Sequence, residues 1–118
     1  MGCLEIYGMG TGSRTTRGRH AAGRRDGDAV DGDYGVGGFG GLQELPNLNK
    51  PVIVAVNGIC CGGGFEIALS TDLILAAEHA TFALPEIRSG TVADAASIKL
   101  PKRIPYHIAM DMLLTGRW

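Results

Sequence analysis

Three glycines and two glutamates stand at a spacing that suits acid–base chemistry on a carbonyl compound. Gly62, Gly63 and Gly64 follow an apolar, β-branched run, and Glu66 comes two residues after the last of them. Glu86 supplies a second carboxylate twenty residues downstream. Consecutive glycines between a strand and a helix place bare backbone N–H groups beside a ligand. Amides beside two carboxylates indicate acid–base chemistry on a substrate that develops an oxyanion.

Each carboxylate also has a purely structural interpretation, and taken singly that interpretation is favoured. In the first turn of a helix, Glu66 would stabilise the helix dipole by less than about 1 kcal/mol. Glu86 would be a solvated loop acid. Asp94, eight residues beyond Glu86, would be an N-cap or first-turn acid of the helix that follows. The shared position of Glu66 and Glu86 around the carboxyl end of one strand, where α/β sheets bind ligands, favours a common site instead.

The elements that must position these residues are well patterned from Lys50 onward. The continuous apolar run Val52–Val56 predicts a strand buried on both faces of a parallel sheet, and residues 72–77 predict a second. A helix over residues 64–71 lies between them, so the three elements form a parallel βαβ unit in an α/β fold. The pattern also predicts a short strand at residues 81–83 and helices at residues 93–100 and 104–114.

Other polar residues have weaker claims to a function. Asp72, between helix and strand, is interpreted as structural, and His79 and His107 as surface residues, because they lack partners at useful spacing. Four cations are interpreted as a solvated face or, alternatively, as contacts to an anionic ligand: Arg88, Lys99, Lys102 and Arg103.

The first part of the chain differs in composition from the rest. Residues 1–27 hold five arginines among Gly, Thr and Ala, with hardly an apolar residue after Met9. Such a segment cannot bury enough surface to offset its ordering entropy, so we expect it to be disordered. A basic arm that binds nucleic acid is the alternative, but no aromatic residue is interleaved to stack on bases.

Composition bounds the class of protein. The 118 residues suffice for one small domain, and a net charge of −1 gives no electrostatic argument for nucleic acid or membrane. No apolar run approaches the length of a membrane span, and the first twenty residues lack the apolar core of a signal peptide. Cys3, Cys60 and Cys61 form no CxxC and no metal-binding spacing. We therefore expect a cytoplasmic protein with reduced cysteines and no metal.

Taken in order, these motifs resemble the enoyl-CoA hydratase/isomerase (crotonase) family. The resemblance rests on Lys50–Gly58, on Gly62–Glu66, on Asp72 and on the run Ala83–Pro101. Within the family, the chain is most similar to bacterial carnitinyl-CoA dehydratases, particularly through Phe65–Glu66 and the run Ala83–Pro101. The resemblance implies a partial crotonase-type ββα spiral over residues 28–118, preceded by a disordered or misjoined segment.

The resemblance also implies roles for particular residues. The N–H of Gly63 would be one donor of the oxyanion hole, Glu66 would help activate the water that adds to Cβ, and Glu86 would exchange the proton at Cα. Asp94 matches the position of a catalytic aspartate in dienoyl-CoA isomerases and a dehalogenase of the family. Further residues would contact the substrate: Gly62, Gly64, Pro85 and Gly90.

The same resemblance implies an acyl-CoA thioester as substrate, no cofactor beyond the coenzyme A that the substrate carries, and homotrimers or hexamers. We expect neither nucleic acid nor membrane as a partner. The upstream Ala/Gly-rich segment that supplies the second oxyanion N–H in this family has no counterpart in residues 1–27. Three interpretations therefore stay open: a hydratase or dehydratase, an enoyl- or dienoyl-CoA isomerase, and a catalytically incomplete fragment of such an enzyme.

Overall fold

A computed structural model of the chain describes residues 4–8 and 36–118. Its elements form two small sheets and three α-helices. In the first sheet, β2 (Val52–Val56) is central, β1 (Leu4–Gly8) pairs with it antiparallel, and β4 (Leu73–Ala76) pairs with it parallel. In the second sheet, β3 (Ile59–Cys61) pairs parallel with β5 (Thr81–Ala83). The predicted mixed α/β fold with parallel strands is confirmed.

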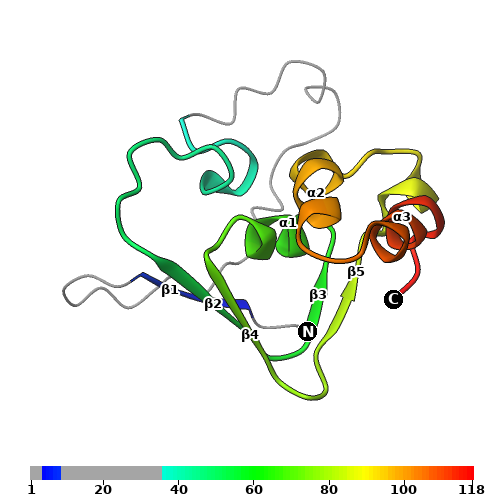
Figure 1. Cartoon of the computed structure of the whole chain (residues 1–118), viewed down its shortest axis with the longest axis horizontal. Coiled ribbons are helices and arrows are strands. Elements are labelled where there is room, and N and C mark those ends of the chain that lie inside the picture. Colours follow the sequence, from blue (N-terminus) through cyan, green and yellow to red (C-terminus); the bar gives the residue numbers. More distant parts are fainter. Residues whose placement is uncertain (1–3, 9–35) are drawn as a thin grey trace.

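The helices pack around these sheets. The α-helices are α1 (Gly63–Leu69), α2 (Asp94–Lys99) and α3 (Tyr106–Thr115), and the short 3-10 helices are η1 (Phe39–Gly41), η2 (Pro85–Ser89) and η3 (Leu100–Lys102). Figure 1 shows the two sheets diverging from each other, with α1 in the angle between them and α2 and α3 beyond it. The predicted strands and helices from residue 52 onward are therefore all present, with ends that differ by one or two residues.

The sequence of β2 explains why this strand is central. Val52, Val54 and Val56 are buried, while Ile53 and Ala55 are half-buried. β-Branched side chains fit such a pleated, enclosed surface. Burial on both faces agrees with the continuous apolar run. The strand thus anchors the core beneath α1. The glycine run was expected at the carboxyl end of this strand, but it follows β3 in the second sheet, so that part of the prediction is wrong.

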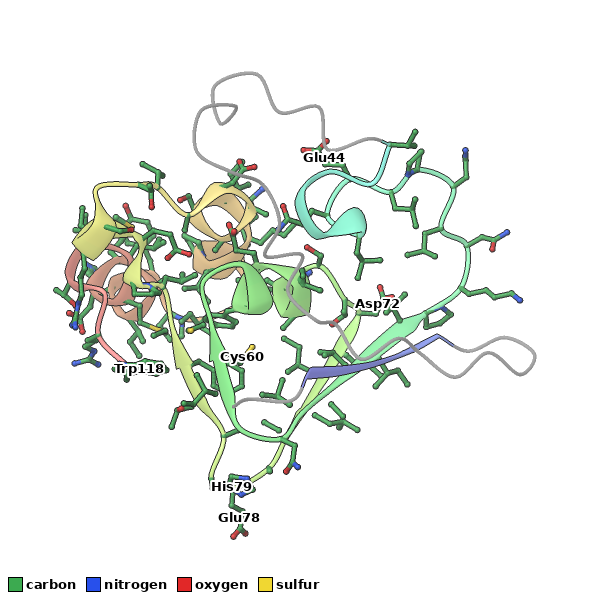
Figure 2. All side chains as sticks on the ribbon, turned by 180° about the vertical axis from the view of Figure 1, so that it is seen from behind. Glu44, Cys60, Asp72, Glu78, His79 and Trp118 are labelled. Atoms are coloured by element: carbon green, nitrogen blue, oxygen red, sulfur yellow. The ribbon has the colours of Figure 1, made fainter. Side chains whose placement is uncertain are left out.

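Asp72 fixes the start of β2 to the start of β4. The N–H of Val52 donates to Asp72 Oδ2 at 2.8 Å, and the N–H of Asp72 donates to the carbonyl of Val52 at 2.9 Å. Figure 2 shows Asp72 beside this strand. The two reciprocal bonds satisfy backbone groups where the parallel pairing begins. The structural interpretation of Asp72 is confirmed.

The prediction that the strand at residues 72–77 is buried on both faces is wrong. Leu73 and Leu75 of β4 are 56% and 62% exposed, and Ile74 is 37% exposed. The reason is position: β4 stands at the edge of the three-stranded sheet, and the described elements cover it only in part. An apolar run predicts the capacity for burial, not the presence of a covering layer.

Two strands were not predicted. No element was predicted for the residues of β3, but they pair with β5, which lies about twenty residues further along the chain. Residues 4–8 fall in the segment that was expected to be disordered, yet they form β1 along β2. Both pairings satisfy backbone hydrogen bonds with distant strands, for which a short run of residues carries no local signal. Residues 9–27 lie outside the described residues, so the expectation for them stays a prediction.

Candidate functional site

Gly62 makes the turn that joins β3 to α1. Its backbone has φ +55° and ψ −133°, a conformation that residues with a Cβ rarely adopt. Its N–H donates to the carbonyl of Ala83 at 3.1 Å, which continues the pairing of β3 with β5. Its carbonyl accepts the N–H groups of Phe65 and Glu66, at 2.9 and 3.0 Å. Gly62 is therefore the single residue between the end of β3 and the start of α1.

The next two N–H groups are left without a protein acceptor. Among the described residues, neither Gly63 nor Gly64 donates a hydrogen bond from its backbone N–H. A Cβ added to Gly64 would meet no atom within 4 Å, so the space beside it is open. The first N–H groups of a helix point outward along its axis and suit a negative charge. The geometry leaves Gly63 available for the predicted oxyanion role, which stays a prediction.

Glu66 is a buried carboxylate held by a neighbouring helix. Its side chain is 4% exposed, and Oε1 accepts the backbone N–H of Ala96 in α2 at 3.1 Å. Burial raises the pKa of Glu66, and the negative charges of Glu86 and Asp94 raise it further, whereas the hydrogen bond from Ala96 opposes the rise. The net effect is a raised pKa for Glu66, which the hydrogen bond from Ala96 partly offsets.

Glu86 lies opposite the turn at Gly62. It stands in the first turn of η2 and is half-buried. A Cβ added to Gly62 would lie 3.1 Å from Glu86 Oε1, so the missing side chain leaves room for this carboxylate. Glu86 Oε2 is buried and has no hydrogen-bond partner among the described residues. Because an unpaired buried oxygen is costly, this oxygen indicates a place where a ligand or water completes the site.

The loop around Glu86 is held by its own backbone. The carbonyl of Glu86 accepts the hydroxyl of Ser89 at 2.9 Å and the N–H of Thr91 at 3.0 Å. Pro85 starts η2, and Gly90 ends it with φ +75°. Pro85 and Gly90 thus shape the segment that presents Glu86. Their predicted contact with substrate stays a prediction.

Asp94 is the first residue of α2, and its side chain is exposed. The N-cap position belongs to Ala93, without a side-chain cap, so the N-cap interpretation of Asp94 is wrong and the first-turn interpretation is confirmed. Its negative charge raises the pKa of Glu66, which places it in electrostatic reach of that carboxylate. The fold thus brings Glu86 and Asp94 within electrostatic reach of Glu66, although the three come from different elements.

Lys99 links the back of α1 to the chain before β2, a feature that the sequence did not predict. Its ammonium donates to Ser70 Oγ at 2.7 Å and to the carbonyl of Gln43 at 3.2 Å, and Ser70 Oγ donates to the carbonyl of Glu66 at 2.8 Å. Burial, followed by the charge of Arg103, lowers the pKa of Lys99. The solvated-face interpretation is wrong for this lysine.

The remaining candidates lie away from the carboxylates. His79 and His107 are exposed, as predicted, and Figure 2 shows His79 at the tip of the loop between β4 and β5. Cys60 and Cys61 are free thiols, and burial raises the pKa of Cys60 to about 12, so that it stays protonated. Cys3 lies outside the described residues.

An apolar pocket of about 360 Å³ opens on another part of the molecule. It lies between α1, β4, β5 and η3, and its lining includes Phe65, Leu69, Leu73, Phe82, Leu100 and Ile104. None of the three carboxylates lines it. In residues 4–8 and 36–118, no group of His, Cys, Asp or Glu is arranged to hold a metal ion. The same residues include no helix long and apolar enough to cross a membrane.

Comparison with known proteins gives concordant matches. The family described as enoyl-CoA hydratase/isomerase matches residues 19–118, beginning nine residues before the predicted boundary at 28. The carnitinyl-CoA dehydratase of Salmonella arizonae is 56% identical over 93 residues, covering 78% of this chain and 36% of that protein. The carnitinyl-CoA dehydratase of Escherichia coli K12 is 53% identical with the same coverage. The chain thus spans about a third of the length of these curated relatives.

Solved structures are similar too. An enoyl-CoA hydratase from Mycobacterium marinum is 51% identical with a TM-score of 0.56, over 58% of this chain and 27% of that one. An enoyl-CoA hydratase from Mycobacterium tuberculosis is 49% identical with a TM-score of 0.57, over the same shares of the two chains. The predicted crotonase-type fold is therefore confirmed for the matched part of the chain.

Proposed function

The chain belongs to the enoyl-CoA hydratase/isomerase family, and on this premise we propose that it acts as a hydratase or dehydratase on an acyl-CoA thioester. The observation that carries the proposal is the unpaired, buried Oε2 of Glu86. The Glu86 carboxylate lies next to Gly62, at the N-terminus of α1. There the N–H of Gly63 has no acceptor among the described residues. A free donor and a free acceptor in one place suit a carbonyl compound with an acidic α-proton.

The proposed mechanism divides the work between donor and carboxylates. The thioester carbonyl accepts the N–H of Gly63, which stabilises the enolate oxygen as charge develops there. Glu66 accepts a proton from the water that attacks Cβ, and Glu86 delivers a proton to Cα. Water is thus added across the double bond, with H at Cα and OH at Cβ. Dehydration runs the same steps in reverse.

The remaining predicted features belong to the same proposal. Gly62 and Gly64 leave the substrate free access to the α1 terminus, while Pro85 and Gly90 hold η2 beside it. The chemistry requires only the proton transfers described above and the thioester that coenzyme A provides, so no further cofactor is proposed. A cytoplasmic location, a place in acyl-CoA metabolism and assembly into homotrimers or hexamers complete the proposal, as does the absence of membrane or nucleic-acid partners.

A second candidate reaction is isomerisation of an enoyl- or dienoyl-CoA. The proximity of Asp94 to Glu66, seen in its effect on the pKa of Glu66, favours it. A third carboxylate would allow a proton to be removed at one carbon and returned at another. Isomerisation leaves the mass of the substrate unchanged, whereas hydration adds one water. Mass spectrometry of the products therefore separates the two reactions.

Turnover by the full 118-residue chain tests the proposal. With crotonyl-CoA and carnitinyl-CoA as substrates, Glu86→Gln should lower the rate by about 10²–10⁴, as expected for loss of a general acid–base group. Glu78→Gln is the matched control, because Glu78 is exposed at the tip of the β4–β5 loop (Figure 2) and should retain the full rate. Equal rates for Glu86→Gln and the unsubstituted chain would overturn the proposal.

The catalytically incomplete alternative makes a different prediction. It expects no turnover and weak binding of a saturated thioester by the unsubstituted chain. Calorimetric titration with butanoyl-CoA measures that binding directly. Micromolar affinity together with turnover would exclude the incomplete alternative, and their joint absence would exclude activity of this chain.

A further inference from the structure

The carboxylate of Glu66 has a protein partner that comes from another helix. Oε1 accepts the N–H of Ala96 at 3.1 Å, thirty residues along the chain. Ala96 is 0% exposed and Glu66 is 4% exposed, so water does not compete readily for this bond. The N–H of Asp94, in the same turn of α2, also acts on this carboxylate, with a smaller effect on its pKa. Oε1 of the carboxylate is thus held by the backbone of α2.

The bond matters because burial and the two neighbouring carboxylates all work against an ionised Glu66. Desolvation raises the pKa of Glu66, and so do the charges of Glu86 on η2 and Asp94 on α2. The positive charge of Lys99 lies within electrostatic reach, but its ammonium donates to Ser70 and Gln43. The N–H of Asp94 lowers the pKa in the same sense as Ala96, to a smaller extent. A buried carboxylate that is to accept a proton needs such donors.

We propose that Ala96 is a positioning residue, whose backbone N–H fixes one oxygen of Glu66 so that the other faces the attacking water. This inference rests on the proposed function, because it assigns the geometry of one of its two carboxylates. It differs from a role in substrate contact, since Ala96 acts through Glu66 alone. The N–H also stabilises the ionised form, in which Glu66 can accept a proton.

The residue type at position 96 agrees with this role. The N–H of Ala96 reaches Glu66 only because the first turn of α2 packs closely on α1, as the contacts between these helices show. A fully buried alanine permits that approach, whereas a long side chain would have to displace α1 or α2. Ala95, the preceding residue of the same turn, is half-buried, and its N–H makes no bond to Glu66. The two alanines are therefore a natural pair for comparison.

The first experiment observes the amide of Ala96 itself, with position 96 unchanged. In an NMR titration, the amide proton of Ala96 should move downfield with the same midpoint as the side-chain carboxyl carbon of Glu66, because ionisation strengthens the bond. Glu66→Gln should abolish that movement, and Asp94→Asn should leave it in place. An Ala96 amide proton that does not titrate, or that titrates equally in Glu66→Gln, would overturn the proposal.

The second experiment removes the donor. Proline lacks the N–H and is tolerated in the first turn of a helix, so Ala96→Pro deletes the bond while Ala95→Pro deletes a neighbouring N–H that Glu66 does not use. Ala96→Pro should raise the proton affinity of Glu66 by about tenfold, as expected for loss of a hydrogen bond to a charged group. Ala95→Pro should leave that affinity unchanged. Equal affinities in the two variants would contradict the proposal.

Kinetics separate this proposal from the proposed function. In an active chain, Ala96→Pro should shift the acidic limb of the kcat/KM profile to higher pH, which a merely structural role would not do. If the chain shows no turnover but the amide of Ala96 still follows the titration of Glu66, the function fails and the positioning bond stands. If turnover occurs and the amide is silent, the reverse holds.

Discussion

The turn that carries Glu66 and the loop that carries Glu86 present the same functional group in opposite ways. Glu66 is 4% exposed, sits in a helix and has one oxygen held by Ala96. Glu86 is half-buried in a 3-10 turn, and its Oε2 has no partner among the described residues. Glu66 is thus positioned by a hydrogen bond from the protein, whereas Oε2 of Glu86 has no hydrogen-bond partner among the described protein atoms.

The difference teaches how one site can assign two tasks to one residue type. A held carboxylate keeps a fixed direction, which suits the orientation of a water molecule. A carboxylate without a protein donor can exchange a proton with a substrate carbon without first breaking a bond. Gly62 brings the two together, because its missing side chain leaves room for Glu86 beside the turn that starts α1. The following predictions test this contrast, in order of expected effect.

The largest effect is expected on exchange of the Cα proton, which the proposed mechanism assigns to Glu86 and not to Glu66. Butanoyl-CoA has no double bond to hydrate, so exchange of its Cα proton with solvent deuterium reports on Glu86 alone. Glu86→Gln should lower the exchange rate by about 10²–10⁴, and Glu66→Gln should lower it far less. Mass spectrometry of the recovered thioester measures the exchange. Equal losses in the two variants would show that the division of roles is wrong.

The next effect should come from the glycine between them. Gly62→Ala places a Cβ at positive φ and 3.1 Å from Glu86 Oε1, so it should destabilise the fold by about 1–3 kcal/mol. Gly64→Ala is the control, because its Cβ would meet nothing within 4 Å and the helix would gain up to about 1 kcal/mol. Urea unfolding measures both variants. A Gly62→Ala chain as stable as the unsubstituted one would contradict the described turn.

The smallest effect should appear in the pH dependence of stability. Burial raises the pKa of Glu66 above its ordinary 4.5 in the folded chain. Between the unfolded and folded pKa values the folded state binds more protons, so the contribution of Glu66 to stability falls as pH rises through this range. Glu66→Gln should therefore gain stability relative to the unsubstituted chain as pH rises above about 4.5. A difference that is constant with pH would contradict the raised pKa.

Sequence reasoning located the parts of this molecule that local pattern controls. The β-branched run of β2, the glycines before α1 and the carboxylate of Asp72 all had signals within a few residues, and the structure has them where they were expected. The same reasoning placed Glu66 and Glu86 near the carboxyl end of β2, whereas the structure places them after β3 and β5, two parallel strands of the second sheet. Their proximity needed no alignment, because the carboxyl ends of parallel strands share an edge.

The features that escaped prediction depend on distant partners. The strand β3 exists through its pairing with β5, and β1 exists through its pairing with β2. The N–H of Ala96 is a backbone group that any residue except proline would carry, so its bond to Glu66 has no sequence signal. The sequence does not distinguish Lys99 from a surface lysine, because its partners, Ser70 and the carbonyl of Gln43, are brought to it by the fold. Tertiary packing decides all four.

The central claim is that the N–H of Gly63 receives the carbonyl of an acyl-CoA thioester between the two glutamates. NMR titration of the labelled, intact chain with butanoyl-CoA tests it most directly. The amide proton of Gly63 should move downfield as the thioester binds, because it gains a carbonyl acceptor, whereas the amide of Gly62 should move little, because it already donates to Ala83. Binding that shifts other amides and leaves Gly63 unchanged would contradict the account.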